Sequence, residues 1–565
     1  MSNLIGEASQ QVEQLLKGAF AAAVEKGELP QGEIPAFTVE IPADTSHGDF
    51  ASNAAMVSAR SFHSAPRKIA EALCNNMELG NSFFDRLEIA GPGFINFFLK
   101  DTWFSQTVEA VLKEQGNYGH SDYGKGEKVM IEFVSANPTG PMHMGNARGG
   151  ALGDCLADAM SCAGYNVTKE FYVNDAGNQV EKFGKSLEAR YLQIHLGEDA
   201  VEFPEDGYHG DDIRELAQEY TDLHGNNLVN VDAGERRKAL IEFALPKNIQ
   251  KMKDDLEKYR IIYDVWFLES TLHESGAVKA AIDTLTQKGM TYEQDGTVWL
   301  KSTELGAEKD NVLVRGNGIP TYFAVDIAYH YNKFAVRGFQ RVINVWGADH
   351  HGHVARLKSA MDAIGLDGSK LDILLMQMVR LVQDGKTVRM SKRSGKAITL
   401  TNLVDEVPVD AARFFFNMRE PNSTLDFDLD LAVEQSSSNP VYYVQYAHAR
   451  ICSILKNLAA EGIQPVQDAE KRNLSLLKMP EERELIRLIA KYPQEIIEAS
   501  KAYDPARITR YTLDLATLFH KFYNACRVKG EDVDLMQARL ALCLAARITL
   551  RNALQLLKIT TPEVM

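Results

Sequence analysis

Two short polar segments hold the side chains best suited to phosphate chemistry, and the first surrounds His143. In it, His143 and Asn146 flank Gly145 in the loop SANPTGPMHMGNARGG, between an apolar run and a helical pattern. The start of a helix offers unpaired N–H groups and the positive end of the helix dipole, and glycine lets a phosphate approach the backbone. The segment is therefore a candidate triphosphate site, although an ordinary helix-capping loop would look similar.

The second segment, DGKTVRMSKRSGKAITL over residues 384–400, is a cationic loop with two glycines. Five basic side chains crowd it, and together they would suit a polyphosphate: Lys386, Arg389, Lys392, Arg393 and Lys396. The alternative is a solvated run of charge without a ligand. What favours the functional interpretation is the order of the two segments along the chain, one at each end of the same series of strands.

A third polar loop, ADHHGH, contains Asp349 and the three imidazoles of His350, His351 and His353. Imidazoles and a carboxylate are legitimate zinc ligands, but no matching cysteine or histidine cluster lies elsewhere in the chain. We therefore expect no bound metal ion here.

The elements around these loops predict a doubly wound parallel sheet. Residues 128–135 form an apolar strand-like run, followed by the first loop and a helical pattern over 144–164. Residues 339–347 repeat this order, leading through ADHHGH into a helical pattern over 354–365. Strand-then-helix units on either side of a long polar stretch predict an α/β domain with an insertion at about 185–310.

The two ends of the chain have different patterns. Residues 1–120 combine a helical start with the strand-like IAGPGFINFFLK, which predicts a small α+β domain. Beyond about residue 436, apolar residues recur three and four apart, which predicts an all-α bundle of four or five helices. This last region has 18 Lys and Arg against 14 Asp and Glu, whereas the whole chain has a net charge of -16. The charge of residues 436–565 is therefore compatible with a polyanionic partner.

Composition limits the class of protein. At 565 residues the chain exceeds the roughly 250 to 300 residues of a single hydrophobic core, which excludes one small binding module. Its 45% hydrophobic and 24% charged residues exclude a disordered chain. The six cysteines are scattered without a CxxC pair, no secretory signal is evident, and no apolar run reaches the roughly 18 residues of a membrane span. We expect a soluble cytoplasmic protein.

Together the motifs resemble those of a known family. His143-Met144-Gly145-Asn146 and Arg389-Met390-Ser391-Lys392 are similar to the HIGH and KMSK motifs of class I aminoacyl-tRNA synthetases. Wider segments, IEFVSANPTGPMHMGNARG, FYVNDAGNQV, YDVWF and YYVQYAHAR, resemble the arginyl-tRNA synthetases in particular. The resemblance extends from HGDFASNAA and GFINFF to the last residue. Asn146 and Arg389 depart from the motifs, the first keeping a donor without charge and the second a charge with another geometry.

The resemblance implies a fold and a domain order. It implies a Rossmann-type α/β catalytic domain with an insertion, an N-terminal α+β domain and a C-terminal all-α bundle. The implied domains are a D-loop-binding domain, the catalytic domain, a connecting segment that contacts the tRNA stem, and an anticodon-binding domain, over residues 1–120, 121–405, 406–435 and 436–565.

The resemblance also implies site residues. The catalytic residues would be His143, Asn146 and Lys392, and the ATP site would comprise His143, Gly145, Asn146, Asp349, Met390, Ser391 and Lys392. The arginine pocket would comprise Glu132, Asn137, Tyr322, Asp326 and His350. A guanidinium binds best to carboxylates placed opposite it. Tyr322 and Asp326 lie on the same face if their segment is helical. Glu132 lies in an apolar strand and should have a partner. A structural ion pair without a ligand is the alternative.

The RNA-binding residues implied by the resemblance lie in the two end domains. Phe94 would stack on a base and Asn96 would read a base edge in the D-loop, while Tyr446, Tyr523 and Met565 would lie near the anticodon. Aromatic side chains at helical spacing are also common in ordinary cores.

The implied activity is a two-step ligation. The carboxylate of arginine attacks the α-phosphate of ATP, with Mg²⁺ on the phosphates, and the terminal ribose of tRNA(Arg) then takes the arginyl group. The resemblance further implies a monomer that needs bound tRNA to activate arginine, with no zinc and no membrane. The alternatives are another class I synthetase, a HIGH-type nucleotidyltransferase, or an inactive synthetase-like RNA-binding protein.

Overall fold

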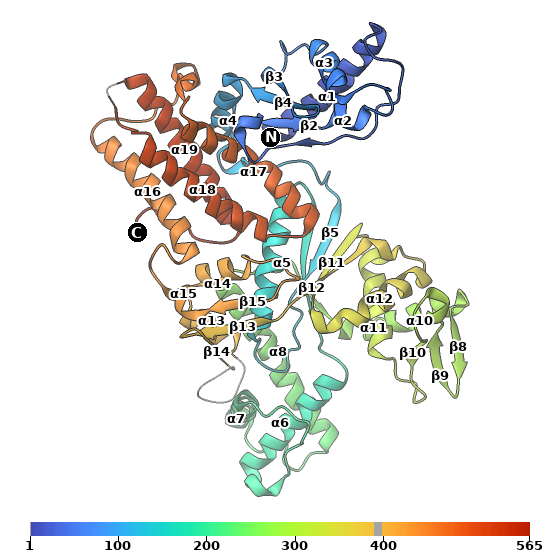
Figure 1. The fold of residues 1–565 in the computed structure, drawn as a ribbon. Helices are drawn as coiled ribbons and strands as arrows, with labels where there is room; N and C mark the ends of the chain where they lie inside the picture. The colour runs from blue at the N-terminus through green and yellow to red at the C-terminus, as the bar shows by residue number, and fades with distance from the viewer. Residues whose placement is uncertain (1, 389–397, 531) are drawn as a thin grey trace.

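The centre of the molecule is a five-stranded parallel sheet in the order β12-β11-β5-β6-β7 (Figure 1). The computed structural model describes residues 2–388, 398–530 and 532–565. The chain builds outward in both directions from the β5–β11 pair, which confirms the predicted doubly wound sheet. Ligands bind such sheets beyond the carboxyl ends of the strands at which the order reverses. The strands are β5 (Lys128–Glu132), β6 (Asn166–Val173), β7 (Val265–Leu268), β11 (Arg341–Gly347) and β12 (Leu371–Met376).

Helix α5 (Met144–Cys162) follows β5 and is enclosed by other elements, with most of its side chains buried. Its glycines explain how it packs so closely. A Cβ on Gly153 would lie 2.3 Å from Cγ of Phe133, directly after β5. The helix therefore has a fixed position on the sheet, and its first turn has a fixed position at the carboxyl edge of β5.

Helices α6, α7 and α8 lie between β6 and β7 and enclose a small hydrophobic core of their own. They occupy one end of the molecule in Figure 1, away from the sheet. Their bounds are α6 (Asn178–Leu196), α7 (Asp211–His224) and α8 (Ala233–Lys258).

A second excursion lies between β7 and β11 and contains a three-stranded antiparallel sheet in the order β10-β9-β8. The single insertion expected over residues 185–310 is therefore divided by β7, a strand of the central sheet. Periodicity does not separate so short an apolar run from its polar surroundings. The elements are α9 (Ser270–Glu274), α10 (Ala277–Gln287), β8 (Thr291–Gln294), β9 (Thr297–Leu300), β10 (Asn311–Val314) and α11 (Tyr322–Tyr331), and α12 (His351–Ile364) follows β11.

The N-terminal region is an α+β unit, as predicted, built on a four-stranded sheet in the order β1-β2-β4-β3. All its strand pairs are antiparallel. The turn between β3 and β4 uses Gly91 and Gly93, both with positive φ. The elements are α1 (Leu4–Glu25), β1 (Val39–Glu40), β2 (Phe50–Ser52), α2 (Ala54–Ser58), α3 (Pro66–Asn75), β3 (Phe84–Ala90), β4 (Phe94–Leu99) and α4 (Asp101–Glu114).

A smaller sheet in the order β14-β13-β15 connects the central sheet to the C-terminal helices. Arg148 of α5 fixes it, because the buried guanidinium donates to the backbone oxygens of Gln377 (2.7 Å), Glu420 (3.0 Å) and Ser423 (2.8 Å). Burial lowers the pKa of Arg148 to about 10. The elements are β13 (Val379–Gln383), β14 (Lys386–Thr387), α13 (Leu400–Glu406), α14 (Val409–Phe416), β15 (Leu425–Asp428) and α15 (Leu429–Val433).

Four long helices form the C-terminal bundle, as the periodicity predicted. Three of them, α16, α18 and α19, pack together on one side of the molecule in Figure 1, while α17 runs back towards α5 and the N-terminal unit. The bounds are α16 (Pro440–Ala460), α17 (Pro480–Ala502), α18 (Ala506–Ala525) and α19 (Val533–Leu556).

The segment after α19 returns to α5 and α14, next to the central sheet. Arg413 of α14 is fully buried and donates to the backbone oxygen of Leu557 (3.0 Å) and to Asp154 of α5 (2.6 Å). Burial alone would raise the pKa of Asp154, but the charges of Arg413 and Lys169 outweigh it and hold that pKa below its usual value. The C-terminal segment is thereby joined to the helix that begins at His143.

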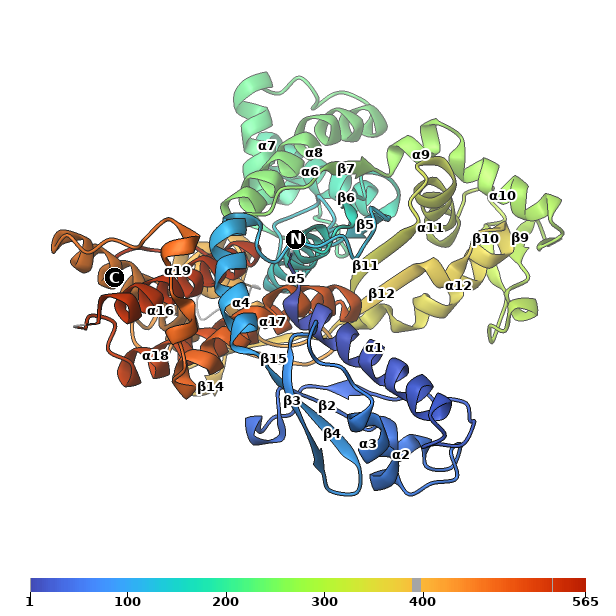
Figure 2. The same cartoon turned by 90° about the horizontal axis from the view of Figure 1, so that it is seen from above.

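The N-terminal unit is held against the bundle by ion pairs, and the two lie side by side in Figures 1 and 2. Asp49 accepts from Nε of Arg487 at 2.5 Å, and Asp101 pairs with Arg483. The carboxylate of Asp49 also accepts the backbone N–H of Leu99 (2.9 Å), so it links β4 to α17.

Candidate active site

His143 is the N-cap of α5, and Asn146 completes the cap. The N–H of Gly145 donates to Nδ1 of His143 (3.1 Å), and the N–H of His143 donates to Oδ1 of Asn146 (2.9 Å). Because Nδ1 of His143 accepts, its proton must lie on Nε2, which makes no hydrogen bond within the described residues. The side-chain NH₂ of Asn146 likewise remains available. Burial lowers the pKa of His143, so the ring is neutral at neutral pH.

Gly145 is required for this cap. A Cβ at Gly145 would lie 2.9 Å from Cε1 and 3.1 Å from Nδ1 of His143. Any larger residue would therefore press on the imidazole that caps the helix. The first N–H groups of α5 already have acceptors, so the donors without a partner among the described residues are Nε2–H of His143 and the side-chain NH₂ of Asn146, and these suit an anionic ligand.

The end of the cationic loop, residues 398–400, lies directly against this cap. The N–H of Met144 donates to the backbone oxygen of Ile398 (3.1 Å), and the N–H of Leu400 donates to that of Met142 (2.8 Å). Residues 389–397, which include Arg389, Met390, Ser391, Lys392, Arg393 and Lys396, lie outside the described residues. The structure thus places Ile398, at the end of the cationic loop, next to Met144 of the first motif, although the two residues are far apart in the sequence.

Glu132, the last residue of β5, is buried and has the partner that its position required. Nζ of Lys333 lies 2.5 Å from Oε2 of Glu132, and the hydroxyl of Ser135 donates to Oε1 (2.9 Å). Lys333 itself is fully buried and also donates to Oδ1 of Asn344 on β11 (3.2 Å). The prediction that Glu132 is partnered is confirmed, and its negative charge is balanced by Lys333.

The backbone just after Glu132 is strained. Val134 and Ser135 have φ values of 69° and 42°, a conformation that a β-branched residue such as valine rarely adopts. The bend aims the hydroxyl of Ser135 at Glu132 and lets it accept the N–H of Tyr172 (3.1 Å). Strain of this kind is typical of functional sites, where it orients a side chain.

Asp326 lies on α11 beside Glu132 and is also buried. Its Oδ2 is 2.7 Å from Nε2 of His353, on the first turn of α12. Burial raises the pKa of Asp326, and the charge of Glu132 raises it further. The segment is helical, as the interpretation of Tyr322 and Asp326 as neighbours required, so the two share one face of α11.

Tyr322 is 56% exposed and forms the open side of this cluster. The negative charge of Asp326 is the largest cause of the raised pKa of Tyr322, and Glu132 and Glu269 also contribute. The charges of three carboxylates therefore act on one exposed phenol. Glu269 follows β7, is buried, and accepts from the hydroxyl of Tyr172 at 2.6 Å.

The remaining expected substrate residues lie around the rim. Asn137 is exposed on the loop after β5, and that loop is attached to α8 because Asn248 donates to the backbone oxygen of Pro138 (2.9 Å). Asp349 and His350 are exposed at the carboxyl end of β11, with His350 Nε2 3.7 Å from Asp349 Oδ2. These residues are open to a ligand above the sheet edge.

Sequence reasoning missed four residues of this cluster: Lys333, His353, Glu269 and Tyr172. His353 was noticed only as part of a histidine run. The signal that could have found Lys333 and Glu269 is weak, because each is one charged residue beside an apolar stretch. Their roles depend on tertiary contacts between distant segments.

The expected D-loop residues lie on β4. Phe94 is half-buried, and Asn96 is 4% exposed, with neighbours on β2 and β3. A Cβ at Gly48 would lie 3.2 Å from Cβ of Asn96, so the segment before β2 covers this side chain. Phe94 is thus the more accessible of the two to a base.

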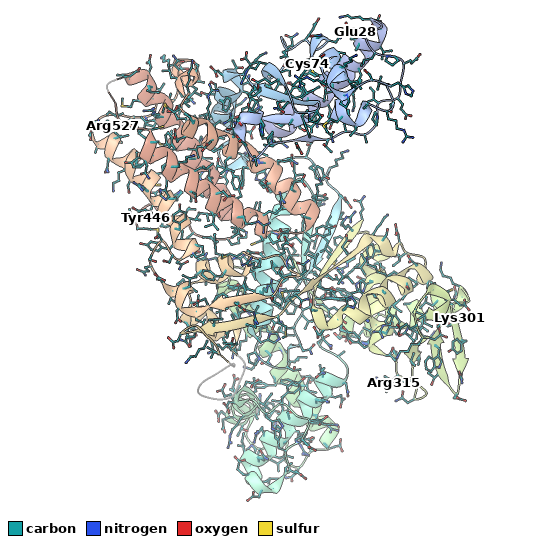
Figure 3. The ribbon with its side chains drawn as sticks, viewed as in Figure 1. Glu28, Cys74, Lys301, Arg315, Tyr446 and Arg527 are labelled. Carbon is teal, nitrogen blue, oxygen red and sulfur yellow. The ribbon has the colours of Figure 1, made fainter. Side chains whose placement is uncertain are left out.

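The structure brings Tyr446 and Tyr523 together on the outer side of the bundle, where Figure 3 labels Tyr446. His520 lies between their helices, with its ring centroid 6.1 Å from that of Tyr446, and Arg450 lies 4.6 Å above the ring of Tyr523. Tyr446 is 42% exposed. Met565 is exposed at the end of a segment that runs along α16, since Nδ1 of His448 and the oxygen of Pro562 are 2.9 Å apart.

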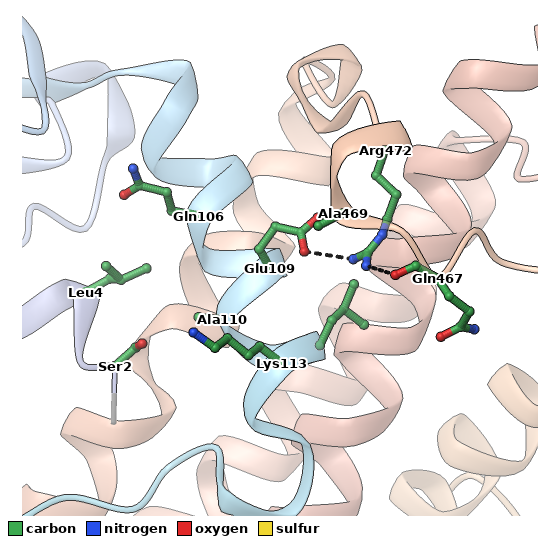
Figure 4. A pocket seen from close by; sticks show the side chains of 10 residues that line it. Ser2, Leu4, Gln106, Glu109, Ala110, Lys113, Gln467, Ala469 and Arg472 are labelled. Atoms are coloured by element: carbon green, nitrogen blue, oxygen red, sulfur yellow. Dashed lines mark hydrogen bonds and ion pairs between the residues drawn. The ribbon is translucent and has the colours of Figure 1, made fainter.

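A separate cavity of about 600 Å³ lies between α1, α4 and the loop before α17, away from the sheet edge (Figure 4). The ion pair between Glu109 and Arg472 (2.8 Å) forms part of its wall. Burial raises the pKa of Glu109 although Arg472 opposes this. The cavity therefore lies at the junction of the N-terminal unit and the helical bundle, and it is separate from the acidic cluster around Asp326.

Within the described residues, no group of three or more histidine, cysteine, aspartate or glutamate side chains has the arrangement of a metal site. None of the described helices is long and apolar enough to cross a membrane. All six cysteines are free thiols.

Comparisons with known proteins cover the whole chain. Residues 10–99 match the arginyl tRNA synthetase N terminal domain, residues 107–453 the catalytic domain of class I (R) tRNA synthetases, and residues 444–565 the DALR anticodon binding domain. Arginine–tRNA ligases of Acetivibrio thermocellus and Caldanaerobacter subterraneus are 55% and 56% identical over 565 residues, with full coverage of both chains.

Solved structures agree with these matches. A structure described as a putative arginyl-tRNA synthetase from Campylobacter jejuni has a TM-score of 0.75 at 33% identity, covering 83% of this chain and 100% of its own. The arginyl-tRNA synthetase of Thermus thermophilus has a TM-score of 0.73 at 23% identity, covering 98% and 100%. The latter likeness supports the fold alone.

The doubly wound sheet, the histidine-capped helix at its switch point and the C-terminal helical bundle define a class I aminoacyl-tRNA synthetase. The matches over the full chain also identify the family within this class. The chain belongs to the arginyl-tRNA synthetase family, and it is an enzyme that charges tRNA with arginine.

Proposed function

We propose that the acidic cluster formed by Glu132 at the end of β5, Asp326 of α11 and Glu269 after β7 binds the side chain of arginine, and that the start of α5 binds ATP. The observation that carries this proposal is a set of three buried carboxylates, Asp326, Glu132 and Glu269, whose charges all act on the exposed phenol of Tyr322. A guanidinium is planar, always charged and a donor on every nitrogen, so it matches such a cluster.

Asp326 is the principal guanidinium acceptor in this proposal. Glu132 has a counter-charge in Lys333, whereas the partner of Asp326 is an imidazole. Asn137, Tyr322 and His350 lie on the rim and would hold the rest of the amino acid. A site of fixed hydrogen-bond acceptors can reject an uncharged analogue by about 10⁴-fold without proofreading.

For ATP, Nε2–H of His143 and the NH₂ of Asn146 would donate to phosphate oxygens, and Gly145, which has no side chain, would let a phosphate approach the backbone. Asp349 would lie on the adenosine side, and Met390, Ser391 and Lys392 would complete the site from the cationic loop. Mg²⁺ would enter with ATP and neutralise phosphate charge. The protein then accelerates the attack of the arginine carboxylate mainly by position and electrostatics, because the two reactants react directly with each other.

The regions around the site would hold tRNA(Arg). We propose residues 1–120 as the D-loop-binding domain with Phe94 and Asn96, residues 121–405 as the catalytic domain, residues 406–435 as the stem-contacting segment, and residues 436–565 as the anticodon-binding domain with Tyr446, Tyr523 and Met565. The proximity of Tyr446, His520, Arg450 and Tyr523 supports the last assignment, because aromatic rings and arginine planes stack on unpaired bases. We also propose a monomer that acts in the cytoplasm, where its free thiols would stay reduced.

The test is arginine-dependent exchange between ATP and pyrophosphate, with and without tRNA(Arg). We expect exchange only with arginine and tRNA, a loss of exchange in Lys392→Ala, and a large loss of preference for arginine over citrulline in Asp326→Asn. Asp283→Asn, an exposed carboxylate on α10, is the matched control and should behave as the wild type. Unchanged discrimination in Asp326→Asn would overturn the pocket assignment.

A further inference from the structure

His353 occupies an unusual position between an acid and a base. It is 8% exposed, and its Nε2 lies 2.7 Å from Oδ2 of Asp326. Its Nδ1 faces the guanidinium of Arg356, one turn further along α12, with Nε of Arg356 at 3.2 Å. Both ring nitrogens are therefore engaged, one by a carboxylate and one by a guanidinium.

This arrangement determines the protonation of His353. A guanidinium in a protein only donates hydrogen bonds and does not lose its proton, so Nδ1 of His353 must accept from Arg356. The single ring proton is then on Nε2 and is donated to Asp326. The imidazole is neutral, so Asp326 receives a hydrogen bond but no balancing positive charge from it.

Arg356 is held in place by contacts other than an ion pair. Its guanidinium donates to Oδ1 of Asn311 on β10 (3.3 Å) and lies 4.6 Å from the ring of Phe323. Among the described residues, no carboxylate lies within ion-pair distance of Arg356. Its closest hydrogen-bonding partner is His353.

We propose that His353 and Arg356 are positioning residues that make Asp326 the specificity determinant for arginine. Arg356 holds His353 in the neutral tautomer, and His353 fixes the orientation of the Asp326 carboxylate while leaving its charge for the guanidinium of the substrate. This inference rests on the proposed role of Asp326.

Other charged and titratable groups also face Asp326. On its own helix these are Tyr322 and His330, whose Nδ1 lies 2.8 Å from the backbone oxygen of Asp326. Glu132 of β5, Lys333 after α11 and Glu269 after β7 act on the cluster from the other sides. His330 is buried, and burial lowers its pKa well below the ordinary value, so it adds no positive charge to the cluster.

The first experiment compares His353→Phe with His353→Gln, because glutamine can place an N–H near the position of Nε2. We expect the KM for arginine to rise by about tenfold to a hundredfold in His353→Phe and by about threefold in His353→Gln, with the KM for ATP unchanged in both. Equal effects of the two variants, or a parallel rise in the KM for ATP, would overturn the proposal.

Asp326→Asn is measured in parallel. If it leaves the arginine KM unchanged, the proposed pocket itself is wrong. If it abolishes arginine use while His353→Phe has no effect, only the positioning role is overturned.

The second experiment uses Arg356→Gln and Arg356→Lys. Without a guanidinium at Nδ1, His353 can take a second proton and pair with Asp326 as a cation that competes with arginine. We expect the ratio of the arginine KM in Arg356→Gln to that of the wild type to rise about tenfold as the pH falls from about 8 to about 6. The ratio for Arg356→Lys, which keeps a cationic donor, should stay flat. A ratio in Arg356→Gln that does not change with pH would contradict the proposal that Arg356 holds His353 in its neutral tautomer.

Discussion

Asp326 and Glu132 are neighbouring buried carboxylates with different environments. The Lys333 ammonium lies 2.5 Å from Glu132, whereas the partner of Asp326 is the imidazole of His353. Burial and the charge of Glu132 raise the pKa of Asp326. The apolar residues around Glu132 predicted from the sequence that this carboxylate has a partner. Only the tertiary structure identifies Lys333 as that partner and His353 as the partner of Asp326.

The raised pKa of Asp326 predicts a pH dependence of arginine binding. The guanidinium stays charged, while a carboxylate with a raised pKa becomes protonated at a higher pH than an ordinary aspartate, whose pKa is about 3.9. Arginine affinity should therefore fall as the pH drops through this raised value, at a higher pH than an ordinary aspartate would give. The measurement is the KM for arginine at a series of pH values. In Asp326→Asn the dependence should disappear, and a wild-type KM that stays constant down to about pH 4 would contradict the prediction.

Asn146 has two roles that can be separated. Its Oδ1 caps α5, so Asn146→Ala should lower the free energy of unfolding by about 1 kcal/mol and also raise the KM for ATP. Helix α13 has the same kind of cap, in which Asn402 pairs with Thr399, so Asn402→Ala is the matched control. It should lose similar stability in urea unfolding with a smaller effect on ATP. Equal changes in the ATP KM would mean that Asn146 acts only as a cap.

At the level of secondary structure, the site depends on where four elements end. β5, β6, β7 and β11 end at the same edge of the sheet, and α5 and α11 begin beside it. Strand-then-helix order predicted β5, α5, β11 and α12, because each has an apolar run followed by a helical period. β7 was not separated from its polar surroundings. The π-helical turn Asn332–Val336 that carries Lys333 was also unpredicted, since nothing in the periodicity distinguishes it from the end of α11.

The close approach of α5 to the sheet predicts a strong effect of Gly153→Ala. The added Cβ would overlap the ring of Phe133, so overpacking should cost about 1 to 3 kcal/mol of unfolding free energy. Gly18→Ala on α1 is the matched control, because no atom lies within 4 Å of its Cβ position and it lies inside a helix. That variant should be neutral or more stable by up to about 1 kcal/mol. Urea unfolding of both proteins measures the difference, and equal stabilities would contradict the packing argument.

Across the whole molecule, charge pairs hold the N-terminal unit against the helical bundle. Asp49 is 7% exposed and lies between the backbone of Leu99 and the guanidinium of Arg487. The sequence predicted both units from their periodicity, but it contains no signal of how they meet, because the paired residues are hundreds of positions apart. The cavity in Figure 4 lies at the same junction.

Arg487→Met should weaken this junction, because it leaves the Asp49 carboxylate buried without its cation. We expect a loss of about 1 to 3 kcal/mol in unfolding free energy and a higher KM for tRNA, with the KM for arginine unchanged at saturating tRNA. Lys501→Met on the same helix removes a more exposed pair with Glu498 and should cost less than about 0.5 kcal/mol. An unchanged tRNA KM in Arg487→Met would mean that the position of the N-terminal unit does not affect tRNA binding.

The contact between Arg413 and Leu557 also affects the order of events during synthesis of the chain. Asp154 and Arg413 leave the ribosome long before Leu557, yet the buried guanidinium needs the Leu557 carbonyl as one of its acceptors. Until that residue emerges, the buried guanidinium of Arg413 beside α5 lacks one of its acceptors. The interior around Arg413 is therefore complete only after Leu557 has been synthesised, 144 residues after Arg413 itself.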